Sequence, residues 1–113
     1  MILGYVIRPK ADADLDEIGD SLADFAGLDH ALRFISQAFE RFELIASQPE
    51  MGWPSRVPHR DLATVRVLNL DKPFEKYLIF YQPSRDQIEI LRVLHGVQDL
   101  QNRLSIEGVL SED

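Results

Sequence analysis

The chain has 113 residues, no cysteine and a formal net charge of −7 at pH 7. This length predicts one domain with its own core, and the absence of cysteine excludes a disulfide framework and thiolate metal sites. No apolar run approaches the roughly 20 residues of a membrane span. The opening MILGYVIRPK has no basic residue before its apolar ones, so we expect no signal peptide and a cytoplasmic location.

The negative charge is concentrated in the N-terminal part of the chain. Residues 1–47 hold four basic and nine acidic residues, whereas residues 48–100 hold seven of each. Non-specific binding to nucleic acid depends mainly on Lys and Arg that neutralise phosphates. We therefore expect no direct sequence-specific contact with nucleic acid, and any such partner would have to meet the neutral C-terminal half.

The first 26 residues predict a strand and a helix. Ile2–Arg8 alternates loosely, and Pro9 then suits the first helical turn because its φ is fixed near the helical value. Ala26-Gly27 is a typical helix end. The amphipathic stripe of this helix consists of apolar residues three or four positions apart, namely Ala11, Leu15, Ile18, Leu22 and Phe25.

A second amphipathic helix is predicted from about Asp29, a favourable N-cap residue, to Ser47. Because the break between the helices is short, they should form an antiparallel hairpin that covers one face of a sheet. The stripe of the second helix comprises Leu32, Ile35, Phe39, Phe42 and Ala46, widened by Phe34, Ala38 and Ile45.

Four aspartates recur every fourth residue on the polar face of the first helix. Like charges at this spacing disfavour the helix slightly. The stripe has two interpretations, a solvated surface or a surface for a basic partner. Its members are Asp12, Asp16, Asp20 and Asp24.

The segment Gln48–Arg60 contains three prolines and a glycine, so it should be an ordered or semi-rigid loop. It carries Trp53, the only tryptophan of the chain. This side chain could close the core as a lid over the junction of helices and sheet, or it could anchor a partner.

The segment from Asp61 to Asp99 predicts an antiparallel meander. Its three apolar runs are LATVRVLNL, FEKYLIFYQ and DQIEILRVLH, and they are rich in Val, Ile, Leu, Phe and Tyr. The breaks at Asp71–Pro73 and Pro83–Asp86 are too short for a helical crossover. A short helix at Val97–Leu104 and an acidic tail over residues 105–113 should follow.

Neither face of the meander is cleanly polar. Strict alternation would place Ile88, Ile90 and Leu94 with Arg92 on one face, and Leu91 and Val93 on the other. Helices should therefore cover one face, and a partner chain, a second copy or the C-terminal tail should cover part of the other. The predicted fold is α+β: one domain over residues 1–104, with an antiparallel sheet of about four strands, the hairpin on one face and a short C-terminal helix.

Together these elements resemble the RelE/ParE superfamily of toxins from type II toxin–antitoxin modules, and the ParE (plasmid stabilisation) branch in particular. The resemblance runs from about Tyr5 to Leu104. It rests on the order of the elements and on six short motifs: Pro9-Lys10-Ala11, Asp14-Leu15, Pro49–Gly52, Val65–Val67, Tyr77–Tyr81 and Ile90–Gly96. One departure is Gln98, because many relatives have arginine before the aspartate that follows His-Gly.

The resemblance implies a toxin that a cognate, ParD-like antitoxin holds inactive, in a heterotetramer or a larger complex. ParE-like toxins poison DNA gyrase and arrest growth, whereas RelE-like toxins cut mRNA in the ribosomal A site. No cofactor is implied. We expect an antitoxin helix on the hairpin, with its continuation on the sheet. The residues expected to meet a partner are Leu15, Leu22, Trp53, Arg66, Tyr81, Arg92 and His95.

Three functions remain open: a non-catalytic gyrase inhibitor, an mRNA endoribonuclease, and a toxin fold that keeps only antitoxin binding. A ribonuclease needs groups that move protons and a cation that stabilises the phosphorane. The residues that could supply them are Glu50, Arg66, Tyr81 and His95.

The basic side chains His95, Arg66 and Arg92 also have a purely structural interpretation. His95 could bond the following turn or Asp99, and Arg66 and Arg92 could pair with a carboxylate on a neighbouring strand. The acidic charge of the chain favours the gyrase inhibitor, because a ribosome-dependent nuclease must hold RNA. His30 and His59 lack the spacing of metal ligands, so no metal site is expected.

Overall fold

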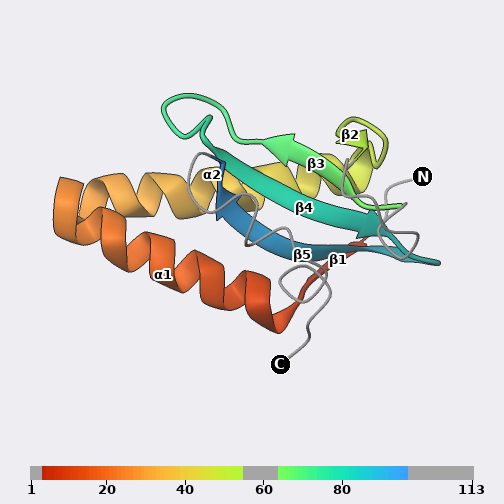
Figure 1. Cartoon of the computed structure of the whole chain (residues 1–113), viewed down its shortest axis with the longest axis horizontal. Coiled ribbons are helices and arrows are strands. Elements are labelled where there is room, and N and C mark those ends of the chain that lie inside the picture. The colour runs from red at the N-terminus through yellow and green to blue at the C-terminus, as the bar shows by residue number, and fades with distance from the viewer. Residues whose placement is uncertain (1–3, 55–63, 97–113) are drawn as a thin grey trace.

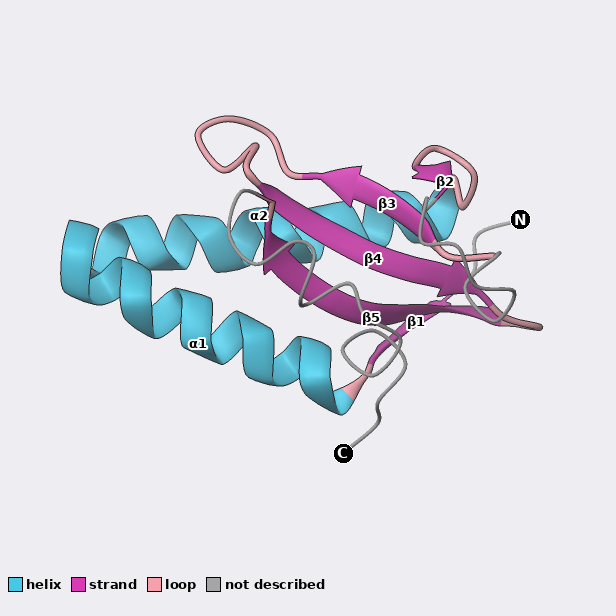
Figure 2. Cartoon of the chain, viewed as in Figure 1, coloured by secondary structure: helices cyan, strands magenta, loops and turns pink. Residues whose placement is uncertain are grey.

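A computed structural model describes residues 4–54 and 64–96. Two helices and a five-stranded sheet make up this part of the chain (Figures 1 and 2). In chain order the elements are β1 (Gly4–Ile7), α1 (Pro9–Ala26), α2 (Leu28–Ser47), β2 (Trp53–Pro54), β3 (Arg66–Asn69), β4 (Tyr77–Pro83) and β5 (Gln87–His95). The predicted helix at Val97–Leu104 and the predicted tail lie outside the described residues.

The strands lie in the order β1-β5-β4-β3-β2. The predicted antiparallel meander is confirmed for β3, β4 and β5. The sheet is mixed, however, with five strands rather than about four, because β1 pairs with β5 in parallel and the two-residue β2 adds to β3. The hairpin explains the parallel pair, since two helices between β1 and the meander form a crossover long enough to return the chain in the same direction.

The helical hairpin lies against one face of the sheet, and both helices pack on β5 (Figure 1). Gly27 ends α1 with a φ of 94°, a left-handed conformation that favours glycine, and it also precedes α2. Thus α2 begins one residue earlier than predicted, and Asp29 lies in its first turn rather than at its N-cap.

The buried face of each helix differs in part from the predicted stripe. In α1, Ala11 and Leu15 are buried, whereas Phe25 at the far end is 89% exposed. In α2, Leu32 and Phe39 are exposed. The buried face of α2 is instead centred on the three residues that were expected only to widen the stripe, Phe34, Ala38 and Ile45. Phe42 and Ala46, two members of the predicted stripe, are buried beside them. The hairpin extends beyond the end of the sheet, so its stripes lose their partner surface there (Figure 1).

A β-bulge in β5 changes which side chains face the helices. Phe80 pairs with Arg92 but Tyr81 pairs with Ile90, so β5 contains one extra residue at this point. Ile88, Ile90 and Val93 consequently belong to the core under the helices, while Leu91 and Leu94 lie in a second cluster. The predicted grouping of Ile90 with Leu94 was wrong because strict alternation assumes an unbroken strand.

The second cluster occupies the sheet face that points away from the helices. It consists of five buried side chains, which come from β3, β4, β5 and the residue before β3: Val65, Val67, Phe80, Leu91 and Leu94. Leu78 is partly buried beside them. All five are at most 5% exposed. The described part of this face therefore offers no exposed apolar patch, although a partner chain, a second copy or the C-terminal tail was expected to cover part of it. Within residues 4–54 and 64–96, the exposed large apolar side chains lie on β1, β2 and the helices.

Within residues 4–54 and 64–96, neither helix combines the length and the apolar character needed to cross a bilayer.

Candidate functional site

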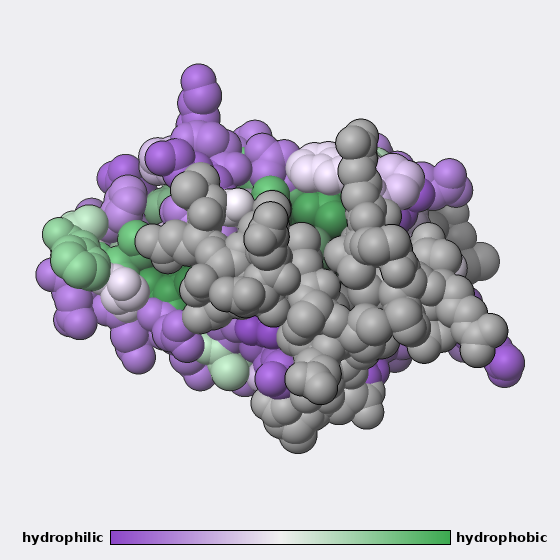
Figure 3. All heavy atoms as spheres, in the orientation of Figure 1, coloured by the Kyte–Doolittle hydropathy of each residue, from purple (hydrophilic) through white to green (hydrophobic). Residues whose placement is uncertain are grey.

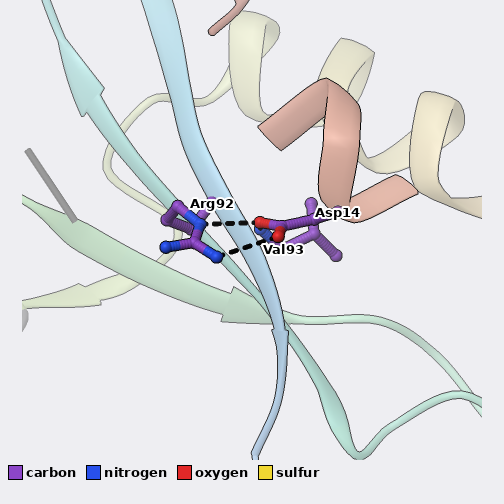
Figure 4. A network of polar contacts seen from close by, with 3 residues as sticks. All are labelled: Asp14, Arg92 and Val93. Carbon is purple, nitrogen blue, oxygen red and sulfur yellow. Dashed lines mark hydrogen bonds and ion pairs between the residues drawn. The ribbon is translucent and has the colours of Figure 1, made fainter. Parts of the chain in front are cut away.

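A buried ion pair joins the first helix to the last strand. Arg92 donates from Nε to Asp14 Oδ2 at 2.8 Å and from Nη2 to Oδ1 at 2.9 Å (Figure 4). The backbone N–H of Val93 donates to the same carboxylate at 2.9 Å. Both charged side chains are less than 10% exposed. The structural interpretation of Arg92 is thus confirmed, with a helix rather than a strand supplying the carboxylate.

This carboxylate occupies a defined gap in the sheet. The pairing of β1 with β5 ends at Ile7 and Ile90, where the N–H of Arg8 donates to the carbonyl of Ile90. Beyond this point β1 no longer covers the edge of β5, and Asp14 binds the N–H of Val93 instead. Because an unpaired buried N–H is costly, Asp14 substitutes for the missing strand.

Arg66 and Tyr81 hold the loop that follows α2. The Arg66 guanidinium donates from Nε and Nη2 to the carbonyl of Gly52, and from Nη2 to the carbonyl of Glu50. The Tyr81 hydroxyl donates to the carbonyl of Pro49 at 2.8 Å and accepts the N–H of Gly52 at 3.0 Å. The two side chains are partners across β3 and β4. They therefore fix residues 49–52 against the sheet.

Burial raises the pKa of Tyr81 above its ordinary value of 10.0, although the bond from Gly52 and the charge of Arg66 lower it. The hydroxyl is neutral at physiological pH, and both its donor and its acceptor function are in use. This arrangement explains why Gly52 is glycine: a Cβ there would lie 2.6 Å from the carbonyl oxygen of Val67 and 2.7 Å from Tyr81 Oη.

The four residues proposed for ribonuclease chemistry do not all converge: Arg66 and Tyr81 are neighbours, but His95 lies apart from them. Arg66 pairs with Tyr81 of β4 and His95 pairs with Tyr77 of the same strand. Four residues of strand separate these positions, about 13 Å at roughly 3.3 Å per residue. The Glu50 side chain is exposed, and only its backbone carbonyl meets Arg66. A single phosphate needs all its catalytic groups within hydrogen-bond reach.

His95 is half-buried at the end of β5, where its ring packs edge-on against Tyr77 with centroids 5.1 Å apart. Trp53 is 45% exposed on the short β2, so it does not lie in the core as a fully buried lid would. Among the other residues expected to meet a partner, Leu15 and Tyr81 are buried and Leu22 is half-buried against the core.

In the described part of the chain, besides the exposed Trp53, two surfaces stand out that a partner could reach. The first is an open groove of about 610 Å³ between β1 and the C-terminal half of α2, lined by Tyr5, Glu40 and Glu43 among others. Burial and the nearby Glu43 carboxylate raise the pKa of Tyr5. Among the described strands, β1 is paired on one side only. No described strand covers its outer edge, which lies beside a groove that carries two carboxylates.

The second surface is the tip of the hairpin, which the sequence reasoning missed. Phe25, Leu28 and Leu32 are 89, 67 and 56% exposed. A signal was present, because Leu28 and Phe25 flank the Gly27 break and a residue at a break between helices has little surrounding structure to bury it. The four aspartates of the polar stripe are also exposed. In the described residues no group of three His, Asp or Glu side chains could hold a metal ion.

A two-helix hairpin packed on a small sheet, with the meander at its centre, is the fold of RelE/ParE-type toxins. The family described as ParE toxin of type II toxin–antitoxin system, parDE, has a model that matches residues 5–100. The chain belongs to this ParE toxin family.

A solved structure supports the assignment. A chain of the chromosomal ParDE toxin–antitoxin system from P. aeruginosa superposes with a TM-score of 0.69 at 26% sequence identity, covering 83% of this chain and 96% of that one. No curated protein matches the sequence.

Proposed function

We propose that this protein is the toxin of a ParDE-type module, that it inhibits DNA gyrase in the cytoplasm, and that a cognate ParD-like antitoxin neutralises it. The observation that carries the proposal is the match to the ParE family over residues 5–100. Growth arrest, and stabilisation of a plasmid that carries the module, would follow from gyrase inhibition.

The positions of the basic side chains support an inhibitor without catalysis of its own. Arg92 is occupied by Asp14, and Arg66 donates to carbonyls of the loop at residues 49–52. His95 pairs with Tyr77 at the start of β4, whereas Arg66 pairs with Tyr81, four residues further along the same strand. The mRNA endonuclease would need Arg66 and His95 on one phosphate, which the described register disfavours.

The antitoxin is expected to use the groove between β1 and α2. An extended peptide can add to the open edge of β1 through main-chain hydrogen bonds, with side chains alternating into the groove. Glu40 and Glu43 favour Lys or Arg in such a peptide. A heterotetramer or larger complex would place one antitoxin segment on each toxin.

The decisive experiment is a supercoiling assay with purified gyrase and relaxed plasmid. We expect the toxin to block supercoiling, the antitoxin to restore it, and His95→Ala to inhibit as strongly as the wild type. A reconstituted translation reaction should show no mRNA cleavage. Normal supercoiling together with cleavage that His95→Ala abolishes would establish the endonuclease instead. Antitoxin binding with neither activity would indicate a toxin that has lost its toxicity.

A further inference from the structure

Trp53 lies on the sheet face that points away from the helices, at the edge formed by β2. It pairs directly with Val67 of β3, and cross-strand partners project to the same face of a sheet. Val67 belongs to the second cluster, on the face opposite the hairpin. The strand order places β1 and β2 at opposite edges of the described sheet, about 19 Å apart at roughly 4.8 Å per strand spacing (Figure 1). Trp53 is therefore far from the groove beside β1.

The backbone that leads into Trp53 is fixed against the sheet. Three hydrogen bonds from Arg66 and two with the Tyr81 hydroxyl hold residues 49–52. Tyr81 is fully buried, and Gly52 lies so close to β3 that a Cβ there would be 2.6 Å from a main-chain oxygen. These contacts set the position from which the Trp53 side chain projects.

The β2 edge offers a partner a side chain rather than a strand to pair with. The strand has only two residues, and the second, Pro54, has no N–H to donate to an added strand. Trp53 is 45% exposed, and tryptophan is among the residues that contribute most to binding at protein interfaces. Because its backbone is already fixed and its side chain has few torsions, burying it in a partner costs little conformational entropy.

We propose that Trp53 is the anchor by which this toxin binds its target, gyrase, and that Arg66 and Tyr81 are its positioning residues. The target would supply an apolar pocket for the indole ring and a hydrogen-bond acceptor for the indole N–H. The antitoxin is the wrong occupant, because it is expected at the groove and the hairpin, on the other face and at the other edge of the sheet. The inference rests on the proposed function and adds the residue that meets the target.

The first test is a titration of each toxin variant against purified gyrase and relaxed plasmid. Trp53→Ser should raise the concentration needed for half-inhibition by about tenfold or more, as loss of a central anchor does. Trp53→Phe keeps an aromatic ring and should lose less. The control is Phe25→Ser, which removes an aromatic side chain that is 89% exposed at the end of the hairpin. Figure 3 shows hydrophobic atoms gathered there, beyond the sheet. We expect this control to inhibit as strongly as the wild type.

A double-mutant cycle tests the positioning role of Tyr81. Tyr81→Phe removes the hydroxyl that bonds Pro49 and Gly52, so it should weaken inhibition by a smaller factor than Trp53→Ser does. If Tyr81 acts through Trp53, adding Tyr81→Phe to Trp53→Ser should cause no further loss. Additive losses would overturn the positioning role. Circular dichroism verifies that every variant is folded.

Hydroxyl-radical footprinting identifies the occupant directly. Trp53 is the only tryptophan of the chain, so mass spectrometry assigns its oxidation without ambiguity. We expect gyrase to protect Trp53 from oxidation and purified antitoxin to leave it accessible. Protection by the antitoxin would overturn the inference. A dimer in sedimentation that Trp53→Ser abolishes would also overturn it, because the occupant would then be a second copy.

The inference and the proposed function fail in different ways. A wild-type toxin that inhibits gyrase no more strongly than Trp53→Ser does would overturn the inference and leave the proposed function standing. A wild-type toxin without effect on gyrase would overturn both.

Discussion

At the scale of single residues, two arginines with an expected functional role are used to build the structure: Arg66, which could have held a phosphate, and Arg92, which was expected to meet a partner. Arg92 forms a bidentate ion pair with Asp14, and Arg66 donates hydrogen bonds to main-chain carbonyls of the loop after α2. An arginine in a strand presents the same sequence signal whether it is structural or catalytic. The difference lies only in what the fold places within reach of its guanidinium.

The Asp14–Arg92 pair should be worth far more than an exposed pair of the same kind. Replacement of Asp14 by Asn removes the carboxylate from a buried guanidinium and weakens the bond to the Val93 N–H. Loss of one partner of a buried pair costs about 3–5 kcal/mol in the free energy of unfolding. Urea denaturation measures this cost.

The matched control is Asp71→Asn. Asp71 pairs with Arg41 at 2.6 Å, but its side chain is 78% exposed, and such a pair contributes only about 0–1 kcal/mol. Equal effects of the two substitutions would show that the buried Asp14–Arg92 pair contributes no more to the free energy of unfolding than the exposed pair does.

At the scale of elements, two glycines lie where one element packs closely against another. Gly19 lies inside α1, and a Cβ there would meet Ile35 of α2 at 3.7 Å, an ordinary contact distance. Gly52 follows α2, and a Cβ there would collide with the backbone of β3 and with the Tyr81 hydroxyl. The same substitution should therefore have opposite effects at the two positions.

We expect Gly19→Ala to raise the free energy of unfolding by about 0.5–1 kcal/mol, because glycine inside a helix is unfavourable relative to alanine. Gly52→Ala should lower it by about 1–3 kcal/mol, because the backbone has to move. Thermal or urea denaturation of the two variants gives both values. A stable Gly52→Ala variant would mean that the loop is held less tightly than its bonds to Arg66 and Tyr81 indicate.

At the scale of the whole molecule, all three tyrosines are coupled to folding. Burial raises the pKa of Tyr5, Tyr77 and Tyr81, with Glu43 adding to the effect at Tyr5. A raised pKa means that the folded state holds the phenolic proton more tightly than the unfolded state does. The stability that results is complete below the ordinary value of 10.0 and is lost as pH rises through the higher pKa of the folded state.

The protein should therefore become less stable above about pH 10, and Tyr81→Phe should lose less stability over this range than the wild type. Urea denaturation at about pH 8.5 and about pH 10.5 compares the two proteins. The phenolate absorbance of the folded wild type should appear only above the ordinary pKa. A parallel decline in both proteins would exclude Tyr81 as a source of the pH dependence.

The sequence by itself determined the positions of most elements. Helix α1 occupies the residues that Pro9, the apolar spacing and Gly27 predicted, and the three runs after Asp61 became β3, β4 and β5. These signals are local, because they depend on φ preferences and on side-chain periodicity within one element. The same signals, with six short motifs, were enough for the family.

Only the tertiary structure decided how the faces are shared. The extra residue in β5 shifts Val93 to the helix side, the parallel β1 stops at Ile90, and Asp14 completes the open edge beyond it. Because the helical hairpin extends beyond the end of the sheet, the sheet does not cover Phe25 and Leu32. Register, bulges and overhang depend on contacts between residues far apart in the chain, and periodicity within a single element carries no information about them.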